Sequence, residues 1–372
     1  MMGYCRMVFP GGNTCEGFHS FYEYIVKADA TRIYVIKGGP GVGKSTFMKT
    51  LGQEFIEEGY NVEYHWCSSD NDSLDALVLP DYEIALIDGT APHVVDPRNP
   101  GAVDEIINLG EFWNEARLAS SRQGILSANQ LVGKYFRLAY LRLKAAHSSW
   151  NEWSEYYGDA VPIAVRRWLT RSIKQEIGDA ANHCASGTNW TRHLFASAIT
   201  PGGIITYANT LLEDCTMALA VRGAPGTGVQ TVLSSILAWA EEEGFPVEAY
   251  HNPLIPSNLD MVIFRCSGKA VIDCSSVVID YDSIVEKIPH VKYYDLNQMA
   301  DGTKLMRFTE DIEDVQERFN TALQGAVGYI DLAKRTHDLM ETYYVPAMNF
   351  NLIDNKRNEI KERILGYIKS SN

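Results

Sequence analysis

The sequence predicts an α/β protein made of two copies of one unit, each a mainly parallel sheet flanked by helices and carrying a helical appendage. Two observations predict this fold class. Short apolar runs typical of buried strands alternate with helix-forming segments in both halves. Residues 223–231 also repeat residues 38–46 at an offset of 185. We therefore expect two domains, residues 1–188 and 189–372.

The repeat continues downstream of these segments without a gap. At the same offset of 185, residues 58–63 match 243–248, residues 74–75 match 259–260, and residues 85–88 match 270–273. A chance similarity does not hold one register over this length. We interpret the pattern as the duplication of a whole unit.

Each copy is expected to run strand, glycine-rich loop, helix, strand, short helix or loop, strand. The strands are predicted near 32–36, 62–67 and 84–88 in the first copy, and near 217–221, 247–250 and 270–273 in the second. Turns followed by helices over 18–26 and 207–213 are expected ahead of the first strands. Helical appendages are expected over 103–177 and 311–368, and the junction between copies near 178–192.

The loop after the first predicted strand carries the strongest motif of the chain. It reads Gly38, Gly39, Pro40, Gly41, Val42, Gly43, Lys44, Ser45, Thr46 and fits G-x-x-x-x-G-K-[ST], the phosphate-binding P-loop. Glycines allow backbone N–H groups to turn toward a phosphate, and the following helix adds the positive end of its dipole. The lysine can reach the β- and γ-phosphates, and the serine hydroxyl can ligate Mg²⁺.

A second chemical element follows the third predicted strand. Asp88 ends the apolar run 84–88, at the edge of the sheet where ligands of open α/β sheets bind, and predicts a second Mg²⁺ contact. The next loop contains His93, which could position a water or sense the γ-phosphate, and Arg98, which could neutralise charge. Ordinary surface roles for these two residues stay open. The catalytic candidates are therefore Lys44, Asp88 and His93.

The second copy of the loop departs from the motif. Val229 stands in the place of Lys44 and Gln230 in that of Ser45, while Thr231 comes one position late for a metal ligand. The loss of a charge and of a hydroxyl weakens the binding of a magnesium triphosphate. We expect this half to bind nucleotide weakly or not at all, as a regulatory remnant or a structural support.

Composition restricts the class of protein. The net charge of −14 disfavours non-specific nucleic-acid binding and anionic membranes. The seven cysteines form no C-x-x-C pair, which indicates reduced thiols rather than a disulfide frame or a zinc site. The first residues lack the apolar stretch of a signal peptide, and no run approaches the ~20 apolar residues of a membrane span. A cytoplasmic protein is expected.

Four segments together resemble a known family. They are residues 38–46, 65–70, 86–97 and 192–201, and they are similar to the bacterial tandem P-loop ATPase-like proteins. The resemblance covers nearly the whole chain and implies a member of the P-loop NTPase superfamily that binds ATP and Mg²⁺. It implies no particular substrate or partner.

Three functions are compatible with these residues. The first is ATP hydrolysis that drives or gates a conformational change. The second is a small-molecule kinase with Asp70 or Asp72 as base, and the third is a non-catalytic, nucleotide-dependent interaction protein. An arginine finger from Arg166, Arg167 or Arg171 is weighed against a solvated helix face. GTP is disfavoured because residues 355–358, Asn-Lys-Arg-Asn, lack the aspartate of N-K-x-D.

Overall fold

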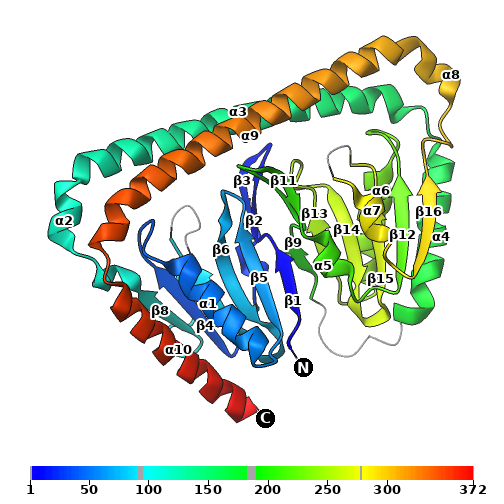
Figure 1. The fold of residues 1–372 in the computed structure, drawn as a ribbon. Helices are drawn as coiled ribbons and strands as arrows, with labels where there is room; N and C mark the ends of the chain where they lie inside the picture. The colour runs from blue at the N-terminus through cyan, green and yellow to red at the C-terminus, as the bar shows by residue number, and fades with distance from the viewer. Residues whose placement is uncertain (1, 91–94, 182–189, 277–278, 372) are drawn as a thin grey trace.

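The computed structural model describes residues 2–90, 95–181, 190–276 and 279–371. Over these residues the chain forms two six-stranded sheets, two small hairpins and long helices that cross from one sheet to the other (Figure 1). The six cysteines in the described ranges are all free. None of the helices described is long and apolar enough to cross a membrane.

The two sheets have corresponding strand orders. The first runs β1 (Cys5–Val8), β5 (Val62–Cys67), β6 (Asp70–Leu79), β7 (Ile84–Asp88), β4 (Arg32–Lys37), β8 (Asp104–Asn108). The second runs β9 (Arg192–Leu194), β13 (Glu248–His251), β14 (Leu259–Phe264), β15 (Lys269–Asp273), β12 (Met217–Arg222), β16 (His290–Asp295). In each sheet the third strand pairs antiparallel with both neighbours, and the other pairs are parallel.

All six predicted strands are present, but the sheets are mixed rather than mainly parallel. The short helix or loop expected before the third predicted strand is instead an antiparallel strand, β6 in the first half and β14 in the second. Their apolar ends, Leu74–Leu79 and Leu259–Phe264, are buried in the sheets. The helix expected over 18–26 is also wrong. There the chain forms a hairpin of β2 (Gly11–Thr14) and β3 (Gly17–Ser20), followed by the short 3-10 helix η1 (Tyr22–Tyr24).

The second half has the matching hairpin of β10 (Ser197–Thr200) and β11 (Gly203–Thr206). Here the helix expected over 207–213 is confirmed as α5 (Ala208–Leu212). Short helices connect the remaining elements: α2 (Glu115–Ser120), α7 (Tyr281–Val285) and α8 (Gly302–Leu305), with 3-10 turns η2 (Pro80–Tyr82), η3 (Leu109–Phe112), η5 (Arg265–Ser267), η6 (Met306–Phe308) and η7 (Val345–Ala347).

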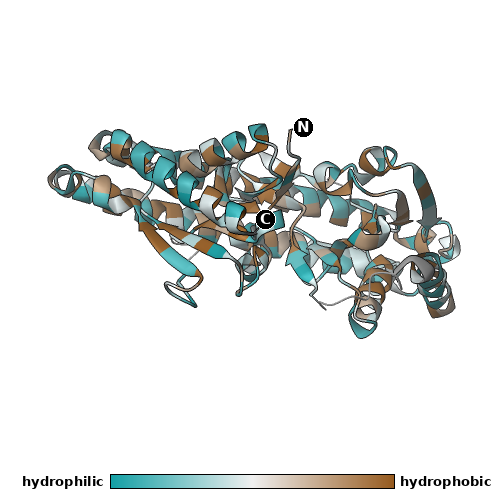
Figure 2. Cartoon of the chain, turned by 90° about the horizontal axis from the view of Figure 1, so that it is seen from below, coloured by the Kyte–Doolittle hydropathy of each residue, from teal (hydrophilic) through white to brown (hydrophobic). Residues whose placement is uncertain are grey.

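The helical appendages exchange partners between the halves. Helix α3 (Arg122–Gly158) pairs along its length with α9 (Thr309–Tyr344), across both sheets (Figure 1). Helix α4 (Ile163–Ala181) packs on α6 (Val229–Glu242) of the second half, and α10 (Phe350–Ser371) packs on α1 (Lys44–Glu57) of the first. Hydrophilic and hydrophobic residues alternate along these helices, as expected when one face is buried (Figure 2).

The two sheets meet at the edge strands β1 and β9. Phe9 and Phe195 exchange backbone hydrogen bonds of 2.9 and 3.0 Å, and both rings are buried. Beside them, Arg192 forms an ion pair with Glu63 across the interface. Although burial acts to raise it, the Arg192 guanidinium holds the pKa of the Glu63 carboxyl well below its usual range. The result is one continuous interior shared by the two halves.

Candidate functional site

The first loop joins β4 to α1 and turns on two glycines. Gly41 has φ +65° and Gly43 has φ +87°, a left-handed backbone that favours glycine. Helix α1 begins at Lys44, directly after Gly43. The backbone N–H groups of Gly38, Gly39, Gly41 and Gly43 make no hydrogen bond to the residues that the structure describes. The loop therefore has donors free to bind an anion at the positive end of a helix.

Lys44 and Asp88 lie side by side next to this loop. The Lys44 ammonium donates to the carbonyls of Gly38 and Gly39, at 3.0 and 2.9 Å, and its Nζ lies 3.6 Å from Asp88 Oδ2. Their side chains are only 12% and 17% exposed. Asp88 stands at the end of β7, beside β4, and its Oδ1 accepts from the N–H of Thr90. The structure thus brings together two of the three predicted catalytic residues.

Ser45 is the candidate metal ligand on the helix side. It lies in the first turn of α1, and its Oγ accepts a 3.0 Å hydrogen bond from the N–H of Leu74 on β6. Among the described residues, no group of three or more His, Cys, Asp or Glu could hold a metal ion. A magnesium ion needs few protein ligands when phosphates and waters supply the rest, so Ser45 and Asp88 fit it as an oxygen donor pair.

The remaining predicted loop residues differ in exposure. Val42 is buried in the hydrophobic core around α1, whereas Thr46 is exposed. His93 lies outside the described residues, so its role stays a prediction. Lys37 orders the flanks of that segment, because its ammonium donates to the carbonyls of Gly89 and Val95, both at 2.8 Å.

The first loop is covered by the end of α9 and the start of α10. A Cβ at Gly39 would lie 2.7 Å from the Tyr344 ring, and one at Gly41 would lie 3.0 Å from Val345. The Phe350 ring is the nearest neighbour of Gly43. Sequence reasoning missed this cover because it comes from the other repeat, and no motif marks it.

The alternative candidates have other partners. Asp70, a possible kinase base, lies 3.4 Å from the Lys334 ammonium of α9 and accepts from the Ser73 hydroxyl. Asp72 is exposed. Arg167 and Arg171 are exposed as well, in agreement with a solvated helix face. Arg166 instead lies against the second loop, where a Cβ at Gly228 would be 2.5 Å from its Cδ.

The second loop has the same backbone turn, but some of its N–H groups have hydrogen-bond partners within the protein. Gly226 and Gly228 have φ of +88° and +105°. The N–H of Gly223 donates to Ser275 Oγ at 3.0 Å, and the N–H of Ala224 donates to Asn297 Oδ1 at 2.8 Å. Thr227 N–H donates to the Ala224 carbonyl. Part of the anion-binding capacity of this loop is therefore used within the protein.

Gln230 occupies the place where Ser45 and a metal would act in the first half. Its Oε1 accepts from the N–H of Leu259 at 2.8 Å, the counterpart of Ser45 and Leu74. Its Nε2 donates to Asp273 Oδ2 at 2.7 Å. Burial raises the pKa of Asp273 to about 6, although hydrogen bonds from Ser275 and Gln230 act in the opposite direction. The amide thus satisfies the carboxylate without a charge.

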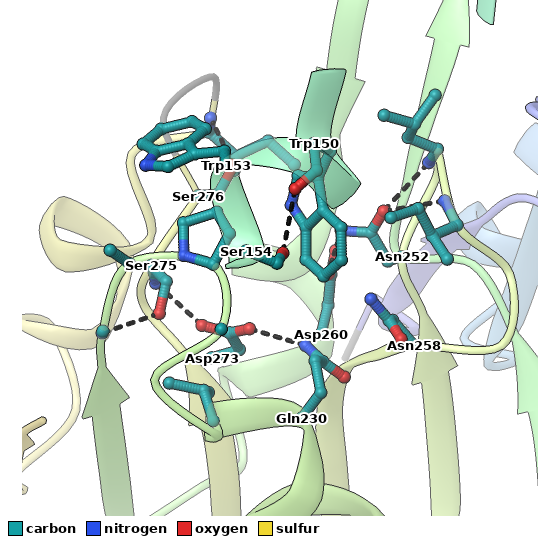
Figure 3. A pocket seen from close by; sticks show the side chains of 18 of the residues that line it. Trp150, Trp153, Ser154, Gln230, Asn252, Asn258, Asp260, Asp273, Ser275 and Ser276 are labelled. Carbon is teal, nitrogen blue, oxygen red and sulfur yellow. Dashed lines mark hydrogen bonds between the residues drawn. The ribbon is translucent and has the colours of Figure 1, made fainter. Parts of the chain in front are cut away.

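A cavity of about 260 Å³ opens beside this second loop (Figure 3). Its walls include Trp150 and Trp153 of α3, Phe319 of α9 and the loop 223–228. The buried Asp260 and the half-buried Asp273 also line it. The sequence signals for this site were the second copy of the loop and the repeated Leu-Asp pair at 74–75 and 259–260, whereas Trp150 and Trp153 come from the other repeat.

Comparison of the chain with protein-family models, with curated proteins and with solved structures found no match. The resemblance to tandem P-loop ATPase-like proteins therefore stays a prediction. The candidate site rests on the geometry of the loop, Lys44, Ser45 and Asp88.

Proposed function

We propose that the N-terminal half binds ATP with Mg²⁺ and hydrolyses it. One observation carries this proposal: the first loop combines unused N–H donors with a lysine, a hydroxyl and a carboxylate at one helix N-terminus. The binding of a triphosphate needs several donors and a positive charge close together, whereas an ordinary surface turn has no need of them.

The residues have distinct roles in this proposal. The loop N–H groups and Lys44 bind the phosphates, and Ser45 and Asp88 would hold Mg²⁺, which neutralises charge on the phosphate oxygens. Lys44 exchanges its carbonyl partners in the loop for phosphate oxygens, since it now donates to Gly38 and Gly39. A residue of the segment after β7, with His93 as the candidate, positions the attacking water.

The cover gives hydrolysis a mechanical output. Tyr344 and Val345 lie on the loop that binds the phosphates, and they belong to the junction between α9 and α10. Helix α9 runs from there to the second sheet along α3. Nucleotide that displaces or orders the junction therefore acts on a helix that reaches the other half of the molecule.

The test is a nucleotide screen followed by a phosphate-release assay on the full chain. We expect ATP binding that requires Mg²⁺, and slow phosphate release without any added acceptor. Release that appears only with an acceptor from cell extract would favour the kinase instead. Absence of binding to any triphosphate with Mg²⁺ would refute the proposal.

A further inference from the structure

Two side chains that line the cavity beside the second loop carry N–H donors without a partner in the described part of the chain. Trp153 and Arg166 both line the cavity, and the indole N–H of Trp153 and the Nε–H of Arg166 are buried without an acceptor among the described residues. Trp153 as a whole is only 5% exposed. A buried donor without a partner costs about 1–3 kcal/mol, so a ligand whose acceptors reach these donors after a small shift of the two side chains recovers part of that cost.

The two carboxylates of the cavity, by contrast, already accept hydrogen bonds from the protein. Asp260 accepts from Tyr281 Oη at 2.7 Å and from Asn252 Nδ2 at 2.9 Å. Asp273 accepts from the side chain of Gln230 and from the N–H of Ser275 at 2.8 Å. An ammonium ligand would find these carboxylates occupied and the Arg166 guanidinium nearby. The site therefore does not call for a cation.

A phosphorylated ligand fits equally poorly. Asp260 and Asp273 line the cavity and Val229 stands in the place of the motif's lysine, so a phosphate would meet carboxylates without the usual counter-charge. Two of the loop N–H groups, those of Gly223 and Ala224, already donate to Ser275 and Asn297. The volume of about 260 Å³ also lies below the usual range for larger ligands.

The walls indicate the shape of the ligand. Trp150 and Trp153 stand across the cavity from Gln230 and Asp273, and Phe319 packs edge-on against Trp153 with centroids 6.4 Å apart (Figure 3). Such walls bind flat rings, and stacking of a base on an aromatic side chain contributes about 1–3 kcal/mol. We propose that this cavity is a second site that binds a neutral nucleobase or nucleoside, between the Trp150 and Trp153 indoles and the Gln230–Asp273 pair. This site is independent of ATP hydrolysis in the first half.

Isothermal titration calorimetry on the full chain tests the proposal, with adenosine, guanosine, cytidine and uridine as ligands. We expect at least one nucleoside to bind, with an affinity that falls about tenfold in Trp153→Phe, which keeps the ring but loses the donor. Trp168→Phe is the matched control, since Trp168 is half exposed on α4 and does not line the cavity. Its affinity should equal that of the wild type.

Two further variants keep the test decisive. Asn258→Trp places a ring at the cavity wall and should abolish binding even if Trp153→Phe lowers stability. Lys44→Ala should leave nucleoside binding unchanged, which separates this site from the first loop. The proposal fails if no nucleoside binds, if phenethylammonium binds better than every nucleoside, or if Lys44→Ala abolishes binding while Trp153→Phe and Asn258→Trp do not.

Discussion

The two loops start from nearly the same residues and the same backbone turn, yet they use their hydrogen bonds in opposite directions. In the first half the Thr90 hydroxyl donates to the carbonyl of Gly38. At the matching positions of the second half, the Ser275 hydroxyl accepts from the N–H of Gly223. The N–H donors at the start of the first loop are unpaired within the ranges that the structure describes, whereas those of Gly223 and Ala224 in the second loop donate to side chains of the protein.

The change at Val229 is therefore one of several that act together. Gln230 stands in the place of Ser45 and donates from its amide to Asp273, and the Asn297 side chain accepts from a loop N–H. Restoring a lysine at 229 alone would leave these groups in place. The comparison teaches that the second loop is held by its own set of internal contacts and does not differ from the first at the lysine position alone.

The largest expected difference between the loops concerns the lysine position. Lys44→Ala removes the only side-chain charge of the loop and should weaken ATP binding roughly 100-fold, ~3 kcal/mol, as for the loss of hydrogen bonds to a charged group. Val229→Ala should change it less than twofold. Titration of ATP with Mg²⁺ into each variant measures both. Equal losses in the two variants would contradict the asymmetry between the halves.

The next difference concerns how tightly each loop is held by the other repeat. A Cβ at Gly226 would lie 2.0 Å from the backbone carbonyl oxygen of Ser154, whereas one at Gly41 meets the Val345 side chain at 3.0 Å. Gly226→Ala should lower the free energy of unfolding by about 4 kcal/mol and Gly41→Ala by about 2. Denaturant titration measures both.

Gly203→Ala is the control for the backbone cost alone. Gly203 has φ +102° and open space around it, so this variant should lose about 1 kcal/mol. A loss in Gly226→Ala no greater than that in Gly203→Ala would show that α3 does not press on the second loop.

The sequence was sufficient for the parts of this fold that depend on local pattern. The six predicted strands are short apolar runs, too short for typical helices, and all six are present. The strands β6 and β14 were missed because Ser-Asp-Asn at 69–71 and Pro-Ser-Asn at 256–258 are typical of turns and caps. In both cases a tertiary partner, the neighbouring strand, decides the structure.

The exchange of α4 and α10 between halves could not be predicted from the chain. Both helices have an ordinary apolar face, with Leu169 and Ile173 in one and Ile360 and Ile364 in the other. Such a face fits either repeat, because α1 and α6 are equivalent helices that follow the two loops. Loop geometry was predictable to the residue, but the side chains that cover each loop were not.

The aspartates of the second half offer a test by pH. Burial raises the pKa of Asp260 to about 7, against an ordinary value of 3.8. Its contribution to stability is therefore full below pH 4 and is lost as the pH rises through 7. The unfolding free energy of the wild type, relative to Asp260→Asn, should fall by roughly 4 kcal/mol between pH 4 and 8.

The difference between the two proteins is the useful quantity, because buried histidines act in the opposite sense. Burial lowers the pKa of His251 to about 4, so its contribution is lost as the pH falls below 6.5. These groups are the same in both proteins and cancel. A difference that does not vary with pH would mean that Asp260 is ionised in the folded state much as in the unfolded chain.

The smallest expected effect concerns the cover of the first loop. If triphosphate must displace Tyr344, only a fraction of the molecules is competent to bind. The apparent dissociation constant then equals the intrinsic one divided by that fraction. Tyr344→Ala should then increase the association rate of ATP about three- to tenfold, with little change in dissociation. Stopped-flow fluorescence with a labelled nucleotide measures both rates. The exposed Tyr293 on β16 supplies the control variant, Tyr293→Ala. An association rate unchanged by Tyr344→Ala would show that the α9–α10 junction does not gate this site, and that hydrolysis there has no lever on the second half.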